Sequence, residues 1–187
     1  MVAWFEFSMI CNFVMLYSFA MGKNEIKVRR IIEENLYLTI SVCDKSGNPW
    51  IANLYYVVDN QYNFYWYSPK TALHSLTIRD NPNVAIAIFN STAVGDDVDA
   101  VYIQAKAYEV TSKLELVAGL RIYAQKMIKT GFAESKQMAG RFMKQYQDFQ
   151  GLSKLRMYKA VPERVWKMAP SEMYNDKFVD SRIEVDL

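Results

Sequence analysis

The sequence has few of the residues that build metal centres and disulfide networks. Its 187 residues include two cysteines and one histidine. Two cysteines make no disulfide framework, and neither lies in a CxxC motif or in a cluster with metal-ligand spacing. A single histidine excludes a metal site built on two histidines. This composition predicts no metal centre and favours a reducing, cytoplasmic environment.

An excess of charge of one sign is also lacking. The chain has 22 basic and 20 acidic residues, which gives a formal net charge of +2. The basic residues are spread along the chain, so no stretch predicts a nucleic-acid surface. Internal repeats, low-complexity segments and linkers are absent from the sequence, and we therefore expect a single domain over residues 23–187.

Residues 1–22 form an apolar N-terminal extension with Glu6 as its only charged residue. It lacks the basic start of a secretory signal. We consider three interpretations: a translated extension upstream of a usual start at Met21, an apolar helix that packs on the domain, and a membrane anchor. The first is favoured and the membrane anchor comes last.

Aromatic and apolar residues are abundant. They make up 14% and 51% of the chain, which argues against disorder. Their pattern predicts a helix over residues 25–35 and then strands over 36–43, 49–59 and 62–68. Short turns separate these strands, so we expect them to pair as an antiparallel meander.

The strand at 62–68 carries aromatic side chains on both faces. Phe64 and Trp66 share one face with Tyr62, and Tyr65 and Tyr67 lie on the other. A strand that is apolar on both faces is covered on both faces. This pattern predicts a barrel with a further element packed against its outside.

The rest of the chain predicts more strands and three helices. A helix over 71–80 is followed by strands over 83–89 and 101–111. Two helices then have apolar faces, a sixth strand over 155–169 is interrupted at Pro162, and a polar tail follows. The apolar faces of the two helices consist of Leu116, Leu120, Tyr123 and Met127, and of Met138, Phe142, Tyr146 and Phe149. The expected fold class is α+β around an antiparallel barrel.

The junction after the third strand has the composition of an anion site. We expect Ser68 to cap the helix and Pro69 to occupy its first position. The free N–H groups and the positive end of the helix dipole attract anions. Lys70 adds a charge and His74 adds an N–H donor or a second charge. These groups suit a phosphate monoester. The alternative is an ordinary helix start with His74 on the surface.

Three stretches of sequence resemble the pyridoxamine 5′-phosphate oxidase-like family of FMN-binding split β-barrels. "LTISVCDKSGNPWIANLYYVVDNQYNFYWYS" is similar to its opening strands and D-x-x-G-x-P turn. "HSLTIRDNPNVAIAIF" and "VYIQAKAYEV" are similar to two later motifs, in the same order. The resemblance covers roughly residues 25–112 and is weaker from Arg156 onward. It implies a split antiparallel β-barrel with surrounding helices.

The family resemblance also implies a cofactor and a set of binding residues. FMN would lie between the two subunits of a homodimer, with its phosphate at the end of the third strand and the helix after it. Trp166 would lie near the flavin. The residues implied to bind the phosphate are Tyr67, Ser68 and His74, and those implied to run alongside the isoalloxazine ring are Ala52, Asn53, Leu54 and Tyr55.

The sequence departs from the family pattern at several cofactor and substrate positions. Ala52 stands where the true oxidase has a phosphate-binding arginine, and Leu73 replaces a basic residue. Ala100 replaces a glutamine that contacts the cofactor, and Gln104 on the same strand face can compensate. The arginines that bind the substrate phosphate have no counterpart after Trp166. We therefore expect a substrate other than pyridoxamine phosphate.

The resemblance thus implies an FMN-binding flavoprotein, an oxidoreductase that acts on a small molecule, and the low cysteine content favours a cytoplasmic location. No residue is assigned as a general acid or base. Three alternatives stay open: a non-catalytic module of the same fold that binds or senses flavin or heme, a reductase that uses the deazaflavin F420, and a membrane-tethered protein whose barrel mediates protein contacts.

Overall fold

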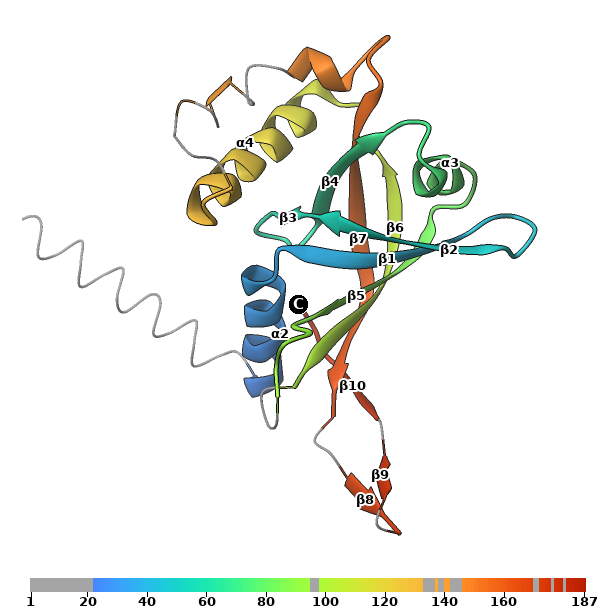
Figure 1. The fold of residues 1–187 in the computed structure, drawn as a ribbon, viewed down its shortest axis with the longest axis vertical. Coiled ribbons are helices and arrows are strands. Elements are labelled where there is room, and N and C mark those ends of the chain that lie inside the picture. Colours follow the sequence, from blue (N-terminus) through green and yellow to red (C-terminus); the bar gives the residue numbers. More distant parts are fainter. Residues whose placement is uncertain are drawn as a thin grey trace, which may run out of the picture.

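The computed structural model describes residues 22–94, 98–132, 137, 140–141, 146–169, 172–175, 177–179 and 181–187. The apolar extension before Gly22 lies outside the described residues, as do Met138 and Phe142 of the predicted second apolar face. Within the described part, a curled antiparallel sheet is surrounded by helices (Figure 1).

The described helices are α2 (Lys23–Glu34), α3 (Leu73–Asp80), α4 (Lys113–Lys129) and a short 3₁₀ helix η2 (Tyr146–Phe149). The strands are β1 (Tyr37–Cys43), β2 (Pro49–Tyr55), β3 (Val57–Val58), β4 (Phe64–Pro69), β5 (Asn83–Phe89), β6 (Ala100–Glu109), β7 (Leu155–Met168), β8 (Glu172–Tyr174), β9 (Lys177–Val179) and β10 (Arg182–Glu184). The predicted α+β class is confirmed, and so are the positions of most predicted elements.

The strand order closes the sheet on itself. Its main path runs β2-β1-β5-β6-β7-β4-β3, with every neighbouring pair antiparallel. The first and last strands of this path are consecutive in the chain and are separated only by Tyr56. The chain therefore passes directly from one edge strand, β2, to the other edge strand, β3. Because this holds the two edges of the sheet together, the sheet curls into a barrel that is split between β2 and β4.

This arrangement corrects the predicted meander. The expected strand over 49–59 is two strands, because the chain changes partner at Tyr56. β2 pairs with β1, whereas β3 pairs with β4 through Val57 and Tyr65. The interruption predicted at Pro162 is confirmed: the register of β6 against β7 shifts between Gln104 and Ala105, opposite this proline.

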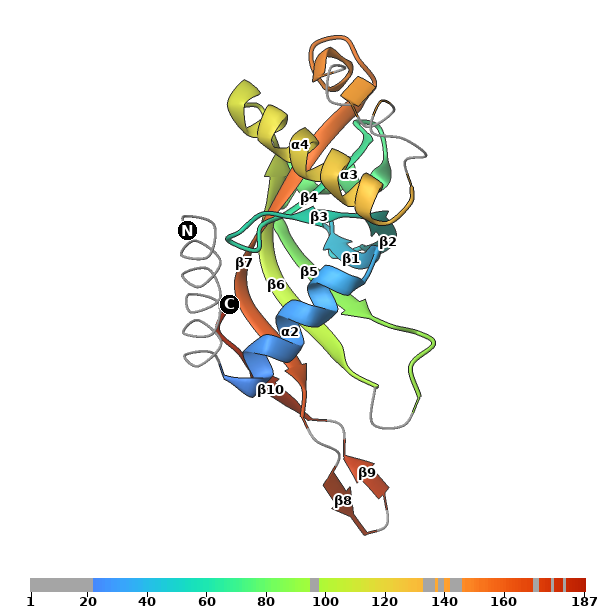
Figure 2. The ribbon, with the colours of Figure 1, turned by 90° about the vertical axis from the view of Figure 1, so that its left-hand side faces the viewer.

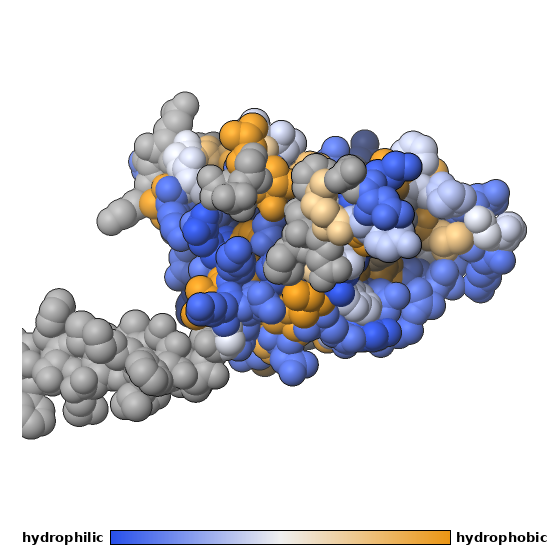
Figure 3. Space-filling view, turned by 90° about the horizontal axis from the view of Figure 1, so that it is seen from below, coloured by the Kyte–Doolittle hydropathy of each residue, from blue (hydrophilic) through white to orange (hydrophobic). Residues whose placement is uncertain are grey.

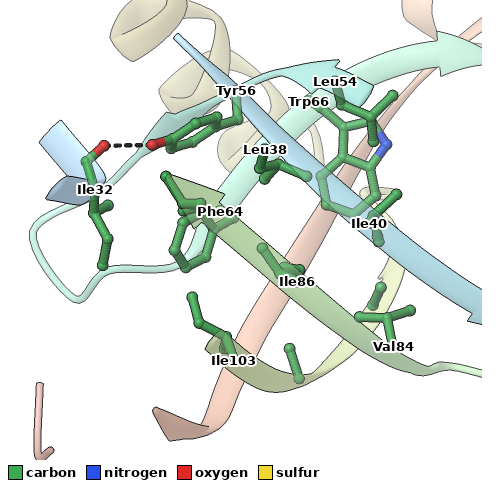
Figure 4. Packing of buried hydrophobic residues seen from close by; sticks show 14 of the residues in the cluster. Ile32, Leu38, Ile40, Leu54, Tyr56, Phe64, Trp66, Val84, Ile86 and Ile103 are labelled. Carbon is green, nitrogen blue, oxygen red and sulfur yellow. Dashed lines mark hydrogen bonds between the residues drawn. The ribbon is translucent and has the colours of Figure 1, made fainter. Parts of the chain in front are cut away.

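The main hydrophobic core fills the inside of the barrel. Phe64, Trp66 and Ile40 are fully buried there, and α2 adds Val28 and Ile32 (Figure 4). A buried phenol ties the helix to the sheet: the Tyr56 hydroxyl donates to the Ile32 carbonyl at 2.5 Å. Carbonyls in the last turn of a helix lack an intrahelical partner, so this bond satisfies one of them.

A second core lies on the outside of the barrel, under α4. Tyr65 packs there with Leu116, Leu120 and Met157. Its strand neighbours Phe64 and Trp66 point inward. The prediction that this strand is covered on both faces is confirmed. The barrel core covers the face of β4 that carries Phe64 and Trp66, and α4 covers the face that carries Tyr65 (Figure 2).

The polar tail forms strands that the sequence analysis did not predict. β10 pairs antiparallel with the end of β7, for example Glu184 with Trp166. β8 and β9 form a separate hairpin that projects away from the barrel (Figures 1 and 2). Seen from the same lower end, the surface is mainly hydrophilic, with hydrophobic residues in separate areas (Figure 3). None of the described helices is long and apolar enough to cross a membrane.

Candidate functional site

The β4–α3 junction differs from its prediction in where the helix begins. Ser68 and Pro69 are the last residues of β4, where they pair with Arg156 and Leu155 of β7. The helix starts at Leu73 with Ala72 as its N-cap, and no side chain caps it. The predicted roles of Ser68 as a cap and of Pro69 as a first helical residue are therefore wrong, because strand pairing holds both residues in β4.

The structure brings His74 and Ser68 into direct contact. The His74 Nε2 lies 2.9 Å from the Ser68 Oγ, and both side chains are buried. β4 supplies the hydroxyl and the first turn of α3 supplies the imidazole. The helix follows the strand after three residues, so the turn folds the ring back over the strand end. The alternative of a surface histidine is wrong.

Burial determines the charge of this histidine. Desolvation lowers the pKa of His74 below its usual 6.5, because the imidazolium loses hydration that the described protein groups do not replace. The ring is therefore neutral at pH 7 and exchanges one hydrogen bond with Ser68. An anion at this position would favour the charged ring and would raise the pKa.

The cation nearest to Ser68 in the sheet is already engaged. Arg156 pairs with Ser68 across β4 and β7. Its Nε contacts the Glu109 carboxylate at 2.9 Å, and its other N–H groups donate to the carbonyls of Gly151, Ser153 and Leu155. Arg156 therefore stabilises the turn before β7, and Lys70 is the half-buried cation that follows β4.

Tyr67 and Tyr55 meet through a third tyrosine. The Tyr123 ring centroid lies 5.3 Å from that of Tyr67 and 5.6 Å from that of Tyr55. The Tyr123 hydroxyl donates to the Tyr55 carbonyl at 2.6 Å. Burial raises the pKa of Tyr123 well above its usual value, so the phenol stays protonated. The two predicted binding tyrosines thus form one aromatic wall with α4.

The other predicted residues of β2 lie on opposite faces of their strand. Ala52 and Leu54 face the barrel core. Asn53 is exposed on the outer face, where its Oδ1 accepts a hydrogen bond from Thr39 at 2.7 Å. β2 is an edge of the main sheet, and α3 contacts it. An extension of the β3–β4 pairing back into β2 would place Leu54 opposite Ser68.

Trp166 and Gln104 do not join the Ser68–His74 pair within one chain. Trp166 is ten residues along β7 from Arg156, the partner of Ser68. At about 3.3 Å per residue that separation is on the order of 30 Å. Gln104 is exposed on the outer face of β6, next to Arg164 of β7. Ala100, which is buried, lies on the same face and is the first residue of β6.

Two residues near Trp166 were missed in the sequence analysis. Tyr102 pairs directly with Trp166, and the Arg182 guanidinium lies 4.4 Å from the centre of the Tyr102 ring. Arg182 reaches this place because β10 pairs with β7. The alternation of charged and apolar residues over 182–184 is the signal that the sequence offers, but three residues are too few to predict a strand.

This chain is similar to solved structures, whereas no family model and no curated protein sequence matches it. A Listeria innocua protein described as a candidate pyridoxamine 5′-phosphate oxidase superposes with a TM-score of 0.51 at 18% identity, over 74% of this chain and 93% of that one. A FAD-binding protein of Mesorhizobium loti gives 0.52 at 15% identity, over 76% and 91%.

A third similar structure is named for heme rather than flavin. The heme storage protein HutZ of Vibrio cholerae superposes with a TM-score of 0.55 at 15% identity, over 77% of this chain and 94% of that one. Identities this low establish the fold alone. The chain therefore has the split β-barrel fold of the pyridoxamine 5′-phosphate oxidase-like proteins, a fold whose named examples include flavin-binding and heme-binding proteins.

Proposed function

We propose that this protein binds FMN and transfers electrons between the flavin and a small molecule. The observation that carries the proposal is the buried contact between Ser68 and His74 at the end of β4. The Ser68 hydroxyl and the neutral His74 imidazole are hydrogen-bonded to each other at this junction. Both can form hydrogen bonds to a phosphate instead. Similarity to a FAD-binding protein and to a candidate oxidase of the same fold supports this choice.

The residues at the junction fit a phosphate group. Ser68 and His74 donate one hydrogen bond each, and the first turn of α3 adds backbone N–H groups that have no intrahelical acceptor. Lys70 adds positive charge nearby. Arg156 is committed to Glu109 and to backbone carbonyls, so this set contains no free arginine. We therefore expect weaker phosphate binding than an arginine-based site gives.

A homodimer would complete the site. Trp166 and Gln104 lie far from Ser68 within one chain, and both occupy the outer face of the sheet. A two-fold axis against this face would bring these residues of one copy toward the junction of the other. Trp50 and Ile51 of the edge strand β2 are exposed and would become buried in such an interface.

The chain's role in this function is binding and orientation. FMN supplies the redox chemistry when it is bound. Ser68, His74 and Lys70 anchor the phosphate, and the aromatic wall of Tyr55 and Tyr67 excludes water from one side. No described side chain is placed as a general acid or base. We propose a cytoplasmic location, in keeping with the low cysteine content.

Heme storage or sensing is the alternative that the fold neighbours favour, since HutZ is named as a heme storage protein. We place flavin first because Ser68, His74 and Lys70 offer hydrogen-bond donors and a positive charge to a phosphate, a group that FMN has and heme lacks. A reductase that uses F420 is a further alternative, and competition between the two cofactors separates it from FMN binding.

An absorbance spectrum of the purified protein tests the proposal. FMN gives two visible flavin bands, and mass spectrometry of the molecule released by heat identifies it. Catalysis requires that bound flavin is reduced by NADH, NADPH or a coupled donor and is then reoxidised at a catalytic rate. A heme spectrum, or no chromophore after addition of FMN, would overturn the proposal.

A further inference from the structure

A groove between α2, β3 and α4 includes neither Ser68 nor His74 in its lining. Its volume is about 930 Å³, and β3 lies between the two helices (Figure 2). Lys126 of α4 is half-buried in this groove, whereas Lys129, one turn further along the helix, is exposed. The other charged residues that line the groove are Arg29, Arg30, Glu33 and Glu34 of α2 and Asp59 after β3.

The Lys126 amine is held against the end of α2. Its Nζ donates to the Asn35 carbonyl at 2.8 Å. It also lies 4.0 Å from the centre of the Tyr56 ring and 5.5 Å from that of Tyr55. A neutral amine can keep the bond to the carbonyl with one N–H group. Its lone pair is then free to react.

The carboxylates that line the groove have other partners. The Glu34 carboxylate contacts the Arg30 Nε at 3.2 Å. Glu33 accepts a hydrogen bond from the Tyr62 hydroxyl at 2.7 Å, and Asp59 accepts hydrogen bonds from its own turn. Within the described part of the chain, the lysine amine in this groove therefore has a carbonyl and aromatic rings around it and no ion pair.

These surroundings favour the neutral form of the amine. Burial, followed by the charge of Lys129, lowers the pKa of Lys126 to about 8. Roughly half of the amine is then neutral at pH 8, whereas an ordinary lysine is neutral to well under about 1% at that pH. The neutral form is the nucleophile, and a desolvated lysine beside another cation is an activated one.

We propose that Lys126 is a covalent modification site at which small aldehydes form an imine. The Nζ lone pair forms a bond to the aldehyde carbon, and the carbonyl π electrons and a proton from nitrogen pass to the oxygen. Loss of water from this carbinolamine leaves the C=N bond. The step is reversible and needs no oxidant or reductant. The inference does not rest on FMN binding.

Reductive labelling of the full-length protein tests this inference. Limiting acetaldehyde and cyanoborohydride are added at pH 8, and peptide mass spectrometry follows the ethylation of each lysine. Lys45, exposed in the β1–β2 turn, is the internal reference. We expect Lys126 to be labelled at least about tenfold faster. A lysine that serves only as a donor to the end of α2 would be labelled no faster than Lys45, and this result would overturn the inference.

The pH dependence and two variants sharpen the test. The labelling rate of Lys126 should level off above about pH 8, while that of Lys45 should keep rising to pH 10. Lys126→Arg keeps a donor for the Asn35 carbonyl and should abolish the fast labelling, whereas Lys45→Arg is the matched control and should retain it. In urea the two lysines should react at similar rates. Fast labelling that survives in Lys126→Arg, or a difference that persists in urea, contradicts the proposed site.

Discussion

The Nε2 of His74 and the Oγ of Ser68 lie 2.9 Å apart, and this contact joins the first turn of α3 to the last residues of β4. Both side chains are buried, so each has the other as the hydrogen-bond partner that water supplies elsewhere. The pair therefore stabilises the junction when no ligand is bound. A phosphate that enters has to replace this bond with bonds of its own.

Removing either member of the pair should weaken FMN binding more than riboflavin binding. His74→Ala and Ser68→Ala each delete one phosphate contact worth about 1.4 kcal/mol or more, which corresponds to roughly tenfold in the dissociation constant. Riboflavin lacks the phosphate and should lose far less. Fluorescence titration with both ligands measures the difference. Equal losses for the two ligands would refute the placement of the phosphate.

The stability of the protein should depend on His74 at mildly acidic pH. Burial lowers the pKa of His74 in the folded state, so the unfolded chain binds the proton first as the pH falls below about 6.5. The stabilisation from the neutral ring is complete above that pH and is lost as the pH approaches the folded-state pKa. Urea unfolding at pH 7.5 and 5 should show a larger loss for the native protein than for His74→Gln. Parallel losses would contradict the burial of this ring.

Tyr56→Phe should destabilise the fold although it removes only one oxygen. The Tyr56 hydroxyl donates to the Ile32 carbonyl in the last turn of α2, and its removal leaves that carbonyl without this donor. The expected loss is about 1 to 2 kcal/mol of unfolding free energy. Tyr37→Phe on the exposed end of β1 is the control and should change stability by less than about 0.5 kcal/mol. Chemical denaturation measures both variants.

Gly119→Ala in α4 should be destabilising, contrary to helix propensity. Alanine is favoured over glycine in a helix by about 1 kcal/mol. A Cβ at residue 119 would lie 2.6 Å from the Met157 Sδ and 3.4 Å from the Tyr65 ring, and both neighbours are buried. Overpacking typically costs about 1 to 3 kcal/mol, so we expect a net loss near 1 kcal/mol. A rise in the thermal midpoint would show that α4 can move away from β7.

Local sequence signals predicted most individual elements because those signals act over a few residues. Alternation and turn residues marked β1, β5 and β6, and the apolar face of α4 was correct at all four predicted positions. The same signals failed at the β4–α3 junction. Ser68 and Pro69 have the composition of a helix start, but pairing with Arg156 and Leu155 retains them in the strand.

The candidate site was only partly predictable. The sequence indicated that Tyr67, Ser68 and His74 lie near one another. The structure adds that Ser68 and His74 are buried and hydrogen-bonded to each other. Trp166 was expected beside the flavin, yet strand length separates it from this pair within one chain. Arg182 was not predicted at all, because its position depends on the pairing of β10 with β7.

The sequence by itself determined the class of fold and the covered third strand, since composition and periodicity express which side chains must leave water. The tertiary structure decided where the strands change partners, as at Tyr56, and which distant residues share a face, as do Tyr102, Trp166 and Arg182. These decisions depend on hydrogen bonds between residues that are far apart in the chain. Such pairings are fixed only when the whole sheet closes, so no local stretch of sequence encodes them.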